Sequence, residues 1–276
     1  MKKTSKKTRK KKISNVINII LIVVCVCVLC VAAYKILSVY VDYKKNTAQV
    51  NEAKEQVFTD TDDEDGDGDE DSTDDDEDED YDYFDFDALL AINSDAIGWI
   101  RMQGDSSADL NNPIDYPVVQ TTDNEYYLKR ALDGSYSAFG TIFADYRISG
   151  GLSAHMCILW GHNMRNPDDM MFGYLNYYDD EEFYEKYPYY DIWVGADHYT
   201  YKVFACGEVA VDGFFFTYSF TDSYTYMDWL SDCFDTLTIY DASLSDFSED
   251  NYIVAFVCCV YPSDYSKRYV LLLYRT

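Results

Sequence analysis

Two adjacent cysteines near the C-terminal end of the chain are the residues best suited to nucleophilic chemistry. Cys258 and Cys259 end an apolar run, 252–257, that is typical of a buried strand. His162 follows a second apolar run, and Arg268 stands at the start of a third. A thiol, an imidazole and a guanidinium that met at one edge of a sheet would supply a nucleophile, a proton carrier and a fixed positive charge.

Strand geometry allows only one of the two thiols to face a given partner. Successive residues of a strand point to opposite faces of a sheet, so if Cys259 met His162, Cys258 would point away, and the reverse. From residue types alone a second interpretation stays open, in which both cysteines are core residues and Arg268 is a surface charge. Which of the two interpretations is correct depends on the strands that position these side chains.

The remaining cysteines and histidines of the C-terminal part carry weaker signals. His155 precedes an apolar run and His198 lies in a short turn, so both are interpreted as exposed polar residues. No pair of cysteines has the spacing of a zinc site, so we expect neither a metal nor a cofactor. Three cysteines sit among apolar neighbours and are predicted to be buried structural thiols: Cys157, Cys206 and Cys233.

The charge of the chain is concentrated in two short segments. Of its 22 basic and 50 acidic residues, eight bases lie in residues 1–12 and 19 acids in residues 60–87. Four bases and three acids lie between these segments, which leaves 10 bases and 28 acids for residues 88–276. Binding to nucleic acid depends on clustered Lys and Arg side chains, and the C-terminal part has no such cluster. We therefore exclude nucleic acid as a partner.

Residues 13–41 form an almost continuous apolar run, long enough to cross a bilayer as a helix. The basic segment 1–12 before it predicts a cytoplasmic N-terminus by the positive-inside rule and places the rest of the chain outside the cell. A cleaved signal peptide is the alternative, but the run is too long for one and lacks a clean small-residue cleavage site. We expect a single-pass anchor in the cell membrane with an extracellular C-terminal domain.

Residues 42–87 are predicted to be an acidic, disordered stalk. A run so rich in Asp and Glu cannot bury apolar surface, and its charges repel one another. Residues 88–276 then form one folded domain, and this length suffices for a sizeable core. The 28 Tyr and 15 Phe residues of the chain favour strands over helices.

The domain is predicted to be mainly β, with many short strands and one helical insertion, which is typical of a closed or nearly closed barrel. Apolar residues from Leu89 to Trp99 recur at helical spacing and predict two short helices at its start. The insertion, 223–237, carries its apolar residues on one helical face. The predicted strands are 117–120, 140–145, 156–160, 189–195, 199–211, 252–260 and 269–274.

Six short motifs, in order along residues 89–276, resemble those of class B sortases, which are cysteine transpeptidases of Gram-positive bacteria. Each motif alone is modest evidence, but six in the family's order are specific. They are 93–100 (NSDAIGWI), 114–120 (IDYPVVQ), 123–128 (DNEYYL), 140–147 (GTIFADYR), 160–164 (WGHNM) and 171–173 (MFG).

The resemblance implies a closed, sortase-type eight-stranded β-barrel with N-terminal helices and a helical insertion before the nucleophile strand. His162 matches the catalytic histidine, although Trp160 stands where the family has tyrosine, and Arg268 matches the catalytic arginine. The family's nucleophile strand ends in threonine-cysteine. Cys259 therefore takes the place of the nucleophile, and Cys258 that of the threonine.

The resemblance also implies a function and its partners. A membrane-anchored sortase cleaves a C-terminal sorting signal of secreted proteins, with the class B pattern asparagine-proline-x-threonine, through a thioacyl intermediate. It then transfers the protein to an amine of a peptidoglycan precursor in the cell wall, or of a pilin. The expected partners are these proteins, the acceptor amine and, through residues 13–41, the membrane. Two alternatives stay open: an extracellular thiol protease that hydrolyses the same signal, and an inactive tethered binding module.

Overall fold

The computed structural model describes residues 2–59, 83–104, 110, 113–164, 169–260 and 264–276. Its helices are α1 (Lys2–Val57), α2 (Phe86–Ile92), α3 (Glu181–Lys186) and α4 (Ser223–Thr236). Short 3₁₀ turns lie at Tyr126–Lys129, Gly151–Ser153, Leu175–Asp179 and Leu244–Asp246. The strands are β1 (Phe58–Thr59), β2 (Tyr83–Phe84), β3 (Ala96–Met102), β4 (Asp115–Val119), β5 (Ile142–Ala144), β6 (Met156–Trp160), β7 (Asn163–Met164), β8 (Met170–Met171), β9 (Tyr189–Val194), β10 (Asp197–Ala210), β11 (Thr238–Ile239), β12 (Ile253–Val260) and β13 (Asp264–Arg275).

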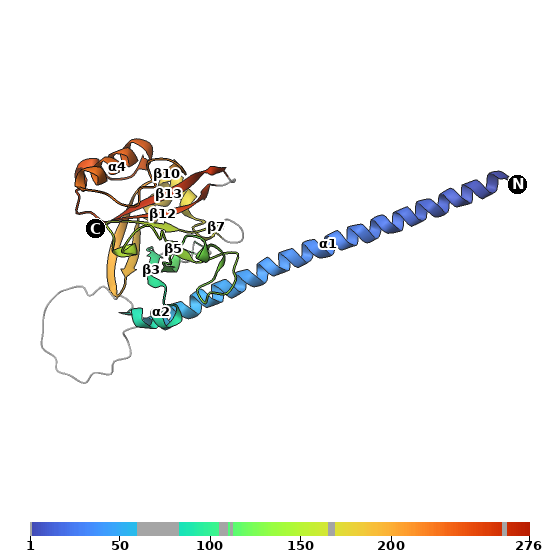
Figure 1. The fold of residues 1–276 in the computed structure, drawn as a ribbon, viewed down its shortest axis with the longest axis horizontal. Helices are drawn as coiled ribbons and strands as arrows, with labels where there is room; N and C mark the ends of the chain where they lie inside the picture. The colour runs from blue at the N-terminus through green and yellow to red at the C-terminus, as the bar shows by residue number, and fades with distance from the viewer. Residues whose placement is uncertain (1, 60–82, 105–109, 111–112, 165–168, 261–263) are drawn as a thin grey trace, which may run out of the picture. The chain divides into compact units, whose positions relative to one another are not determined.

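Eight strands close into a barrel (Figure 1). Neighbouring strands follow the order β10, β13, β12, β6, β5, β4, β3 and β9, and β9 pairs back with β10 to complete the ring. The β12–β6 and β4–β5 pairs are parallel, whereas the other neighbours in the ring are antiparallel. β11 extends the sheet from β10 outside the ring. The predicted closed eight-stranded barrel is confirmed.

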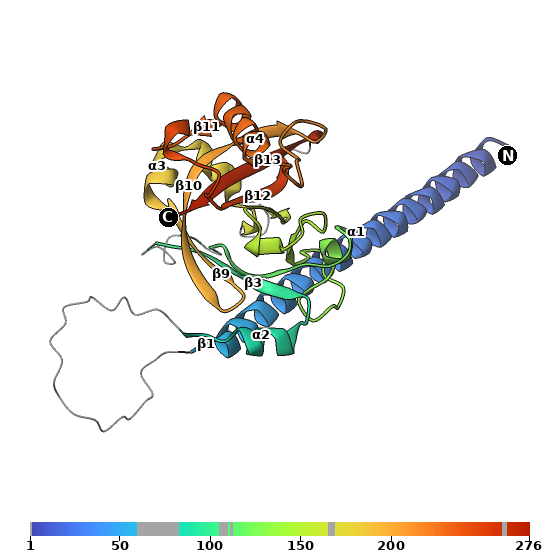
Figure 2. The ribbon, with the colours of Figure 1, turned by 60° about the vertical axis from the view of Figure 1, so that its left-hand side comes forward.

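The predicted helical insertion forms α4, which covers the outer face of β10, β13 and β12 (Figures 1 and 2). The helix begins after Asp222, whose side chain accepts a hydrogen bond from the backbone N–H of Thr225, while the Thr225 hydroxyl accepts one from the Asp222 N–H. Its apolar face includes Trp229, which shares a buried cluster with Val257 of β12 and Val270 of β13. Burial of this face fixes the insertion against the barrel.

The chain divides into two compact units, Met1–Lys45 and Asn46–Thr276. The first unit is the N-terminal part of α1. Within the described residues, one helix, Ile17–Val57, is long and apolar enough to cross a membrane on the basis of length and composition. Its most apolar window has a mean hydropathy of 2.9 and is not buried in the structure. The described part of the apolar run predicted at 13–41 is therefore helical throughout.

Residues 46–59, predicted to belong to the stalk, instead pack on the barrel. Val57 is fully buried in a cluster with Trp99 and Trp193. The ring of Phe58 meets both indoles edge-on, with centroid distances of 5.4 Å to Trp99 and 4.9 Å to Trp193. The average composition of residues 42–87 is acidic and therefore predicts disorder. The few apolar side chains at 46–59 nevertheless make these residues part of the folded domain.

The acidic run begins and ends at the same place on the domain. Residues 60–82 lie outside the described residues, but β1 and β2 on either side of them pair antiparallel, with Phe58 opposite Phe84 and Thr59 opposite Tyr83. The backbone N–H of Asp85 also donates to the carbonyl of Val57, at 2.7 Å. The two described ends of the run, Thr59 and Tyr83, therefore lie side by side. The prediction of a disordered stalk is wrong for residues 42–57, which are helical, and it stays a prediction for residues 60–82.

One of the two helices predicted between Leu89 and Trp99 is a strand. The first is α2, capped by Asp85, whose carboxylate accepts from the backbone N–H of Ala88 at 2.9 Å. The second is β3, which pairs with β4 and β9. Residues on both faces of β3 are buried, so its apolar side chains do not alternate with polar ones. Without this alternation, the spacing of its apolar residues resembles that of a helix.

We expect residues 46–59 to contribute to the stability of the domain and residues 60–82 not to. A fragment spanning 83–276 should unfold in urea with a free energy several kcal/mol below that of 46–276, because burying one Val or Phe side chain contributes about 1.5–3 kcal/mol. A matched fragment, 46–276 with 60–82 replaced by a short Gly-Ser turn, should unfold like 46–276. Equal stability of all three fragments would contradict the packing of α1.

Candidate functional site

Cys258 and Cys259 point to opposite faces of β12. Cys258 is buried on the side of Phe256, whose ring stacks 5.0 Å from that of Phe172 and also meets Tyr190 of β9. Because β9 is not a neighbour of β12 in the ring, this side faces the barrel interior. Cys259 is exposed and points outward. Of the two thiols, only that of Cys259 is open to a substrate.

Arg268 lies directly opposite Cys259 in the pairing of β12 with β13. Directly opposed residues of an antiparallel pair share a face, with their Cβ atoms about 4.5–5.5 Å apart. The guanidinium of Arg268 donates through Nη1 to the backbone carbonyls of Lys267, at 2.7 Å, and Tyr265, at 3.3 Å. A positive charge is thereby held on the face that carries the exposed thiol.

The parallel pairing of β6 with β12 carries His162 to the same edge of the barrel. Trp160 pairs with Val257, so His162 and Cys259 each lie two residues beyond a paired position. The backbone N–H of Gly161 donates to the carbonyl of Val257 at 3.1 Å and continues the pairing by one residue. The structure therefore brings together the three residues that the sequence singled out.

The imidazole of His162 is oriented by a backbone carbonyl. Nε2 lies 2.7 Å from the carbonyl oxygen of Leu128, and because a carbonyl can only accept, Nε2 carries the hydrogen and donates it. The carbonyl of His162 itself accepts from the backbone N–H of Phe172 at 2.9 Å. With Nε2 held in this way, Nδ1 is the ring nitrogen suited to exchange a proton with a thiol or an amine.

The order aromatic-glycine-histidine at 160–162 has a steric reason. A Cβ on Gly161 would lie 2.6 Å from the Phe172 ring, closer than side-chain contacts allow, so a larger residue would push the end of β6 away from that ring. Trp160, which replaces the family's tyrosine, uses its indole N–H to donate to a carboxylate oxygen of Asp145 at 2.9 Å. This bond ties the Trp160 side chain to a fully buried carboxylate.

Asn163 is a further candidate that the sequence did not single out. Its Nδ2 donates to the carbonyl oxygen of Cys259 at 3.1 Å and to Oδ1 of Asn176 at 2.6 Å. These bonds join the loop after His162 to the end of β12. Its place in the matching stretch 160–164 was the only signal for it.

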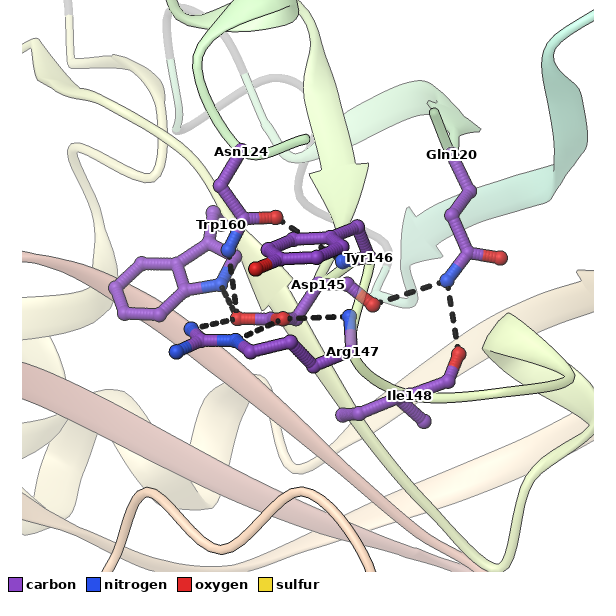
Figure 3. A network of polar contacts seen from close by, with 7 residues as sticks. All are labelled: Gln120, Asn124, Asp145, Tyr146, Arg147, Ile148 and Trp160. Carbon is purple, nitrogen blue, oxygen red and sulfur yellow. Dashed lines mark hydrogen bonds and ion pairs between the residues drawn. The ribbon is translucent and has the colours of Figure 1, made fainter. Parts of the chain in front are cut away.

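A buried carboxylate, Asp145, organises the loop after β5 (Figure 3). Its Oδ1 accepts from the backbone N–H of Arg147 at 3.0 Å and from Nε of Arg147 at 2.8 Å. Its Oδ2 accepts from Nη2 of Arg147 at 2.6 Å, from the indole of Trp160 and from Nδ2 of Asn124 at 2.8 Å. Five donors thus converge on one side chain that is fully buried.

These donors determine the charge state of Asp145. Burial by itself would raise the pKa of Asp145, but hydrogen bonds from Arg147, Trp160 and Asn124 outweigh it, and the pKa lies below the ordinary carboxyl value. The hydrogen bond to Asp145 in turn raises the pKa of Arg147. Both groups are therefore ionised at neutral pH and form a bidentate ion pair two residues apart in the chain.

The other cysteines of the domain are in the predicted surroundings. Cys157, Cys206 and Cys233 are buried and make no disulfide. Burial raises the pKa of each of these thiols, so they stay protonated and unreactive at neutral pH. Among the residues that the structure describes, no group of three or more His, Cys, Asp or Glu side chains is arranged to hold a metal ion.

A cavity of about 510 Å³ opens between residues 217–223, after β10, and the side of the barrel near Arg147 and His155. Neither His162, Cys259 nor Arg268 lines it. The exposed thiol therefore lies outside this cavity, on the neighbouring part of the outer face.

The chain is similar to known sortases over most of its folded part. It is 28% identical over 179 residues to a sortase B of Listeria monocytogenes, an alignment that covers 65% of this chain and 68% of the relative. It is 29% identical over 147 residues to sortase B of Staphylococcus aureus, covering 53% of this chain and 57% of the relative. The solved Staphylococcus aureus sortase B–substrate complex matches the fold with a TM-score of 0.59 and 26% identity, covering 69% of this chain and 84% of that one.

The chain is similar to class B sortases in both sequence and fold. No protein-family model matches it, so the assignment depends on the agreement between these relatives and the barrel. Class B sortases are cysteine transpeptidases of the kind that anchors proteins to the cell wall, and the exposed thiol of β12 agrees with such chemistry. The expected likeness to class B sortases and the expected enzyme class are confirmed.

We expect the two adjacent thiols, Cys258 and Cys259, to differ sharply in reactivity. Cys258→Thr, which keeps a small side chain in the barrel interior, should leave the alkylation of the domain by iodoacetamide unchanged. Cys259→Ala should abolish alkylation of the native domain, because the buried thiols are shielded and protonated. Mass spectrometry of the digested protein locates the adduct. Alkylation of Cys258 in native Cys259→Ala would reverse the assignment of faces.

Proposed function

We propose that this chain uses Cys259, His162 and Arg268 to cut a C-terminal sorting signal of secreted proteins and to join the new carboxyl end to an amine. One arrangement supports the proposal: the exposed thiol stands directly opposite an arginine, and a parallel strand brings a histidine to the same edge. In this arrangement a nucleophile, a proton carrier and a positive charge can act on one peptide bond.

In the first half-reaction the thiolate of Cys259 attacks the carbonyl carbon of the scissile peptide bond. A sulfur–carbon bond forms, and the negative charge that develops on the carbonyl oxygen is stabilised by the guanidinium of Arg268. His162, protonated in this step, gives its proton to the leaving nitrogen as the carbon–nitrogen bond breaks. The products are a thioacyl enzyme and a released peptide with a free amino group.

In the second half-reaction an acceptor amine attacks the thioacyl carbon. Neutral His162 removes a proton from the attacking nitrogen, a new amide bond forms, and the carbon–sulfur bond breaks to restore the Cys259 thiolate. Water in place of the amine would give a free carboxylate, which is the reaction of a thiol protease. The acceptor is a wall-precursor or pilin amine, and the signal has the class B pattern asparagine-proline-x-threonine.

We further propose that the N-terminal helix holds this chemistry at the membrane. Its apolar segment crosses the bilayer once, the basic residues 1–12 stay in the cytoplasm, and the catalytic domain lies at the outer surface of the cell. Enzyme, secreted substrate and acceptor then meet where the sorting signal emerges. The support is the apolar helix together with the basic residues that precede it.

The transfer reaction can be tested with a peptide that carries asparagine-proline-x-threonine and with triglycine as acceptor. The full chain in detergent should form a thioacyl adduct on Cys259 and a peptide–triglycine product, both visible by mass spectrometry. His162→Ala should lower turnover about 10²- to 10⁴-fold, the usual contribution of general acid–base catalysis. Loss of an oxyanion-stabilising donor typically costs about 10²- to 10³-fold, and we expect that from Arg268→Ala.

A scrambled peptide is the control for the transfer experiment. Hydrolysis without any triglycine product, at saturating acceptor, would identify a thiol protease. No adduct and no cleavage with either peptide would favour an inactive binding module.

The topology can be tested on intact protoplasts that express the full chain. Protease added outside should remove the domain and leave a membrane-bound N-terminal fragment that contains the apolar helix. Lysed protoplasts provide the control for protease activity. Full protection of the domain in intact protoplasts would reverse the proposed orientation.

A further inference from the structure

The chain segment 211–220, here called the wall segment, starts next to the strand that carries Arg268. At the end of β10, Val209 pairs with Arg268 of β13. The backbone N–H of Val211 then donates to the carbonyl of Ser266 at 3.0 Å, so the segment leaves the sheet beside the candidate arginine.

The wall segment then crosses the face of the sheet on which the exposed thiol lies. Phe215 is fully buried in the cluster that contains Val257 and Val270. Val257 precedes Cys259 by two residues and Val270 follows Arg268 by two, so all four side chains lie on one face of the sheet. The wall segment therefore borders the surface to which a peptide must bind to reach Cys259.

Two contacts hold the far end of the wall segment, and one carboxylate supports both. The ring of Phe216 stacks on the indole of Trp160, with centroids 5.5 Å apart and planes 11° apart. The guanidinium of Arg147 lies over the ring of Tyr218, with its Cζ atom 3.5 Å from the ring centroid. Figure 3 shows Trp160 and Arg147 both directed at Asp145.

We propose that Asp145 is a positioning residue for peptide binding, which acts through Trp160 and Arg147 to hold the wall segment beside Cys259. This inference rests on the proposed function, since the ligand is the extended sorting-signal peptide, but it concerns binding rather than the chemical step. Asp145 is fully buried, so it acts on a bound peptide only through Trp160 and Arg147.

The hydrogen bonding of the Asp145 carboxylate explains why this one side chain controls the wall segment. An amide at position 145 would place an NH₂ group against N–H donors, because each carboxylate oxygen accepts from two or three of them. The guanidinium of Arg147 would then lose its bidentate partner, and either it or the Trp160 indole would be left without an acceptor. Both aromatic contacts of the wall segment would loosen together.

The chain contains a matched control for this change. Asp115 also accepts from an indole, Nε1 of Trp99 at 2.6 Å, and from an arginine, Nε of Arg101 at 3.3 Å, with Lys54 as an additional partner. It supports the packing of α1 on β3 and β4 and has no contact with the wall segment. Asp145→Asn and Asp115→Asn therefore make the same chemical change in similar surroundings at two different places.

The first measurement separates binding from chemistry, with the full chain in detergent and the asparagine-proline-x-threonine peptide. Asp145→Asn should raise KM about tenfold, the size expected from weakening one aromatic stack and one cation–π contact. It should leave kcat and the rate of Cys259 alkylation by iodoacetamide nearly unchanged. Both variants should lose thermal stability to a similar extent, because each removes the acceptor of an indole and an arginine. Asp115→Asn should show this loss without a change in KM. Equal KM effects of the two variants, or a loss of kcat and alkylation in Asp145→Asn at unchanged KM, would overturn the proposal.

A second pair of variants reaches the wall segment directly and leaves Asp145 with its donors. Tyr218→Ala should reproduce part of the rise in KM, whereas Tyr218→Phe, which keeps the ring under the guanidinium, should behave like the unchanged protein. These variants decide the matter if Asp145→Asn fails to fold. Equal KM values for Tyr218→Ala and Tyr218→Phe would overturn the proposal.

Hydrogen exchange tests the positioning without any turnover. The backbone amides of residues 213–219 should exchange faster in Asp145→Asn than in the unchanged protein, and at the unchanged rate in Asp115→Asn. Unchanged exchange in Asp145→Asn would overturn the inference even if the peptide is cleaved. Failure of the unchanged protein to cleave any sorting-signal peptide would count against the proposed function. The hydrogen-exchange result would then still decide whether Asp145 positions the wall segment.

Discussion

The parallel pairing of β6 with β12 is the constraint on which the rest of the site depends. Residues that pair in a parallel ladder advance together, so the register of Trp160 with Val257 brings His162 and Cys259 to one edge. A shift of one residue would turn Cys259 into the barrel and Cys258 outward. The antiparallel partner β13 then adds Arg268 from the other side. The helical insertion packs on the outer face of the same strands and so supports this edge.

The parts of the protein that carry strong apolar patterns could be predicted from the sequence. β6 and β12 are continuous apolar runs bounded by polar residues, and α4 has an apolar face at helical spacing, so their positions and lengths were evident. His162, Arg268 and one of the two adjacent thiols could be singled out as a group. The choice of Cys259 over Cys258 needed strand register, which the family resemblance supplied and to which the burial of Cys258 lends physical support.

The features that could not be predicted depend on partners far apart in the sequence. β3 is buried on both faces and therefore has no alternating pattern. The packing of α1 depends on a few side chains, such as Val57, at the edge of an acidic stretch whose average composition indicates disorder. Asp145 looks like any acidic residue in the sequence, because its importance comes from Asn124 and Trp160, 21 and 15 residues away. Only the closed barrel brings these groups together.

The opposite orientations of Cys258 and Cys259 also bear on how the protein meets oxidants. Adjacent thiols that point to opposite faces cannot join in a disulfide without turning the strand. The other three cysteines of Asn46–Thr276 are buried as well, so an oxidant in solution reaches the sulfur of Cys259 alone within that unit. Oxidation would then begin with a sulfenic acid or a mixed disulfide at one position, both of which thiol reductants reverse. Under the mechanism proposed above, the first loss of activity by oxidation would be a reversible event at one atom, without rearrangement of the fold.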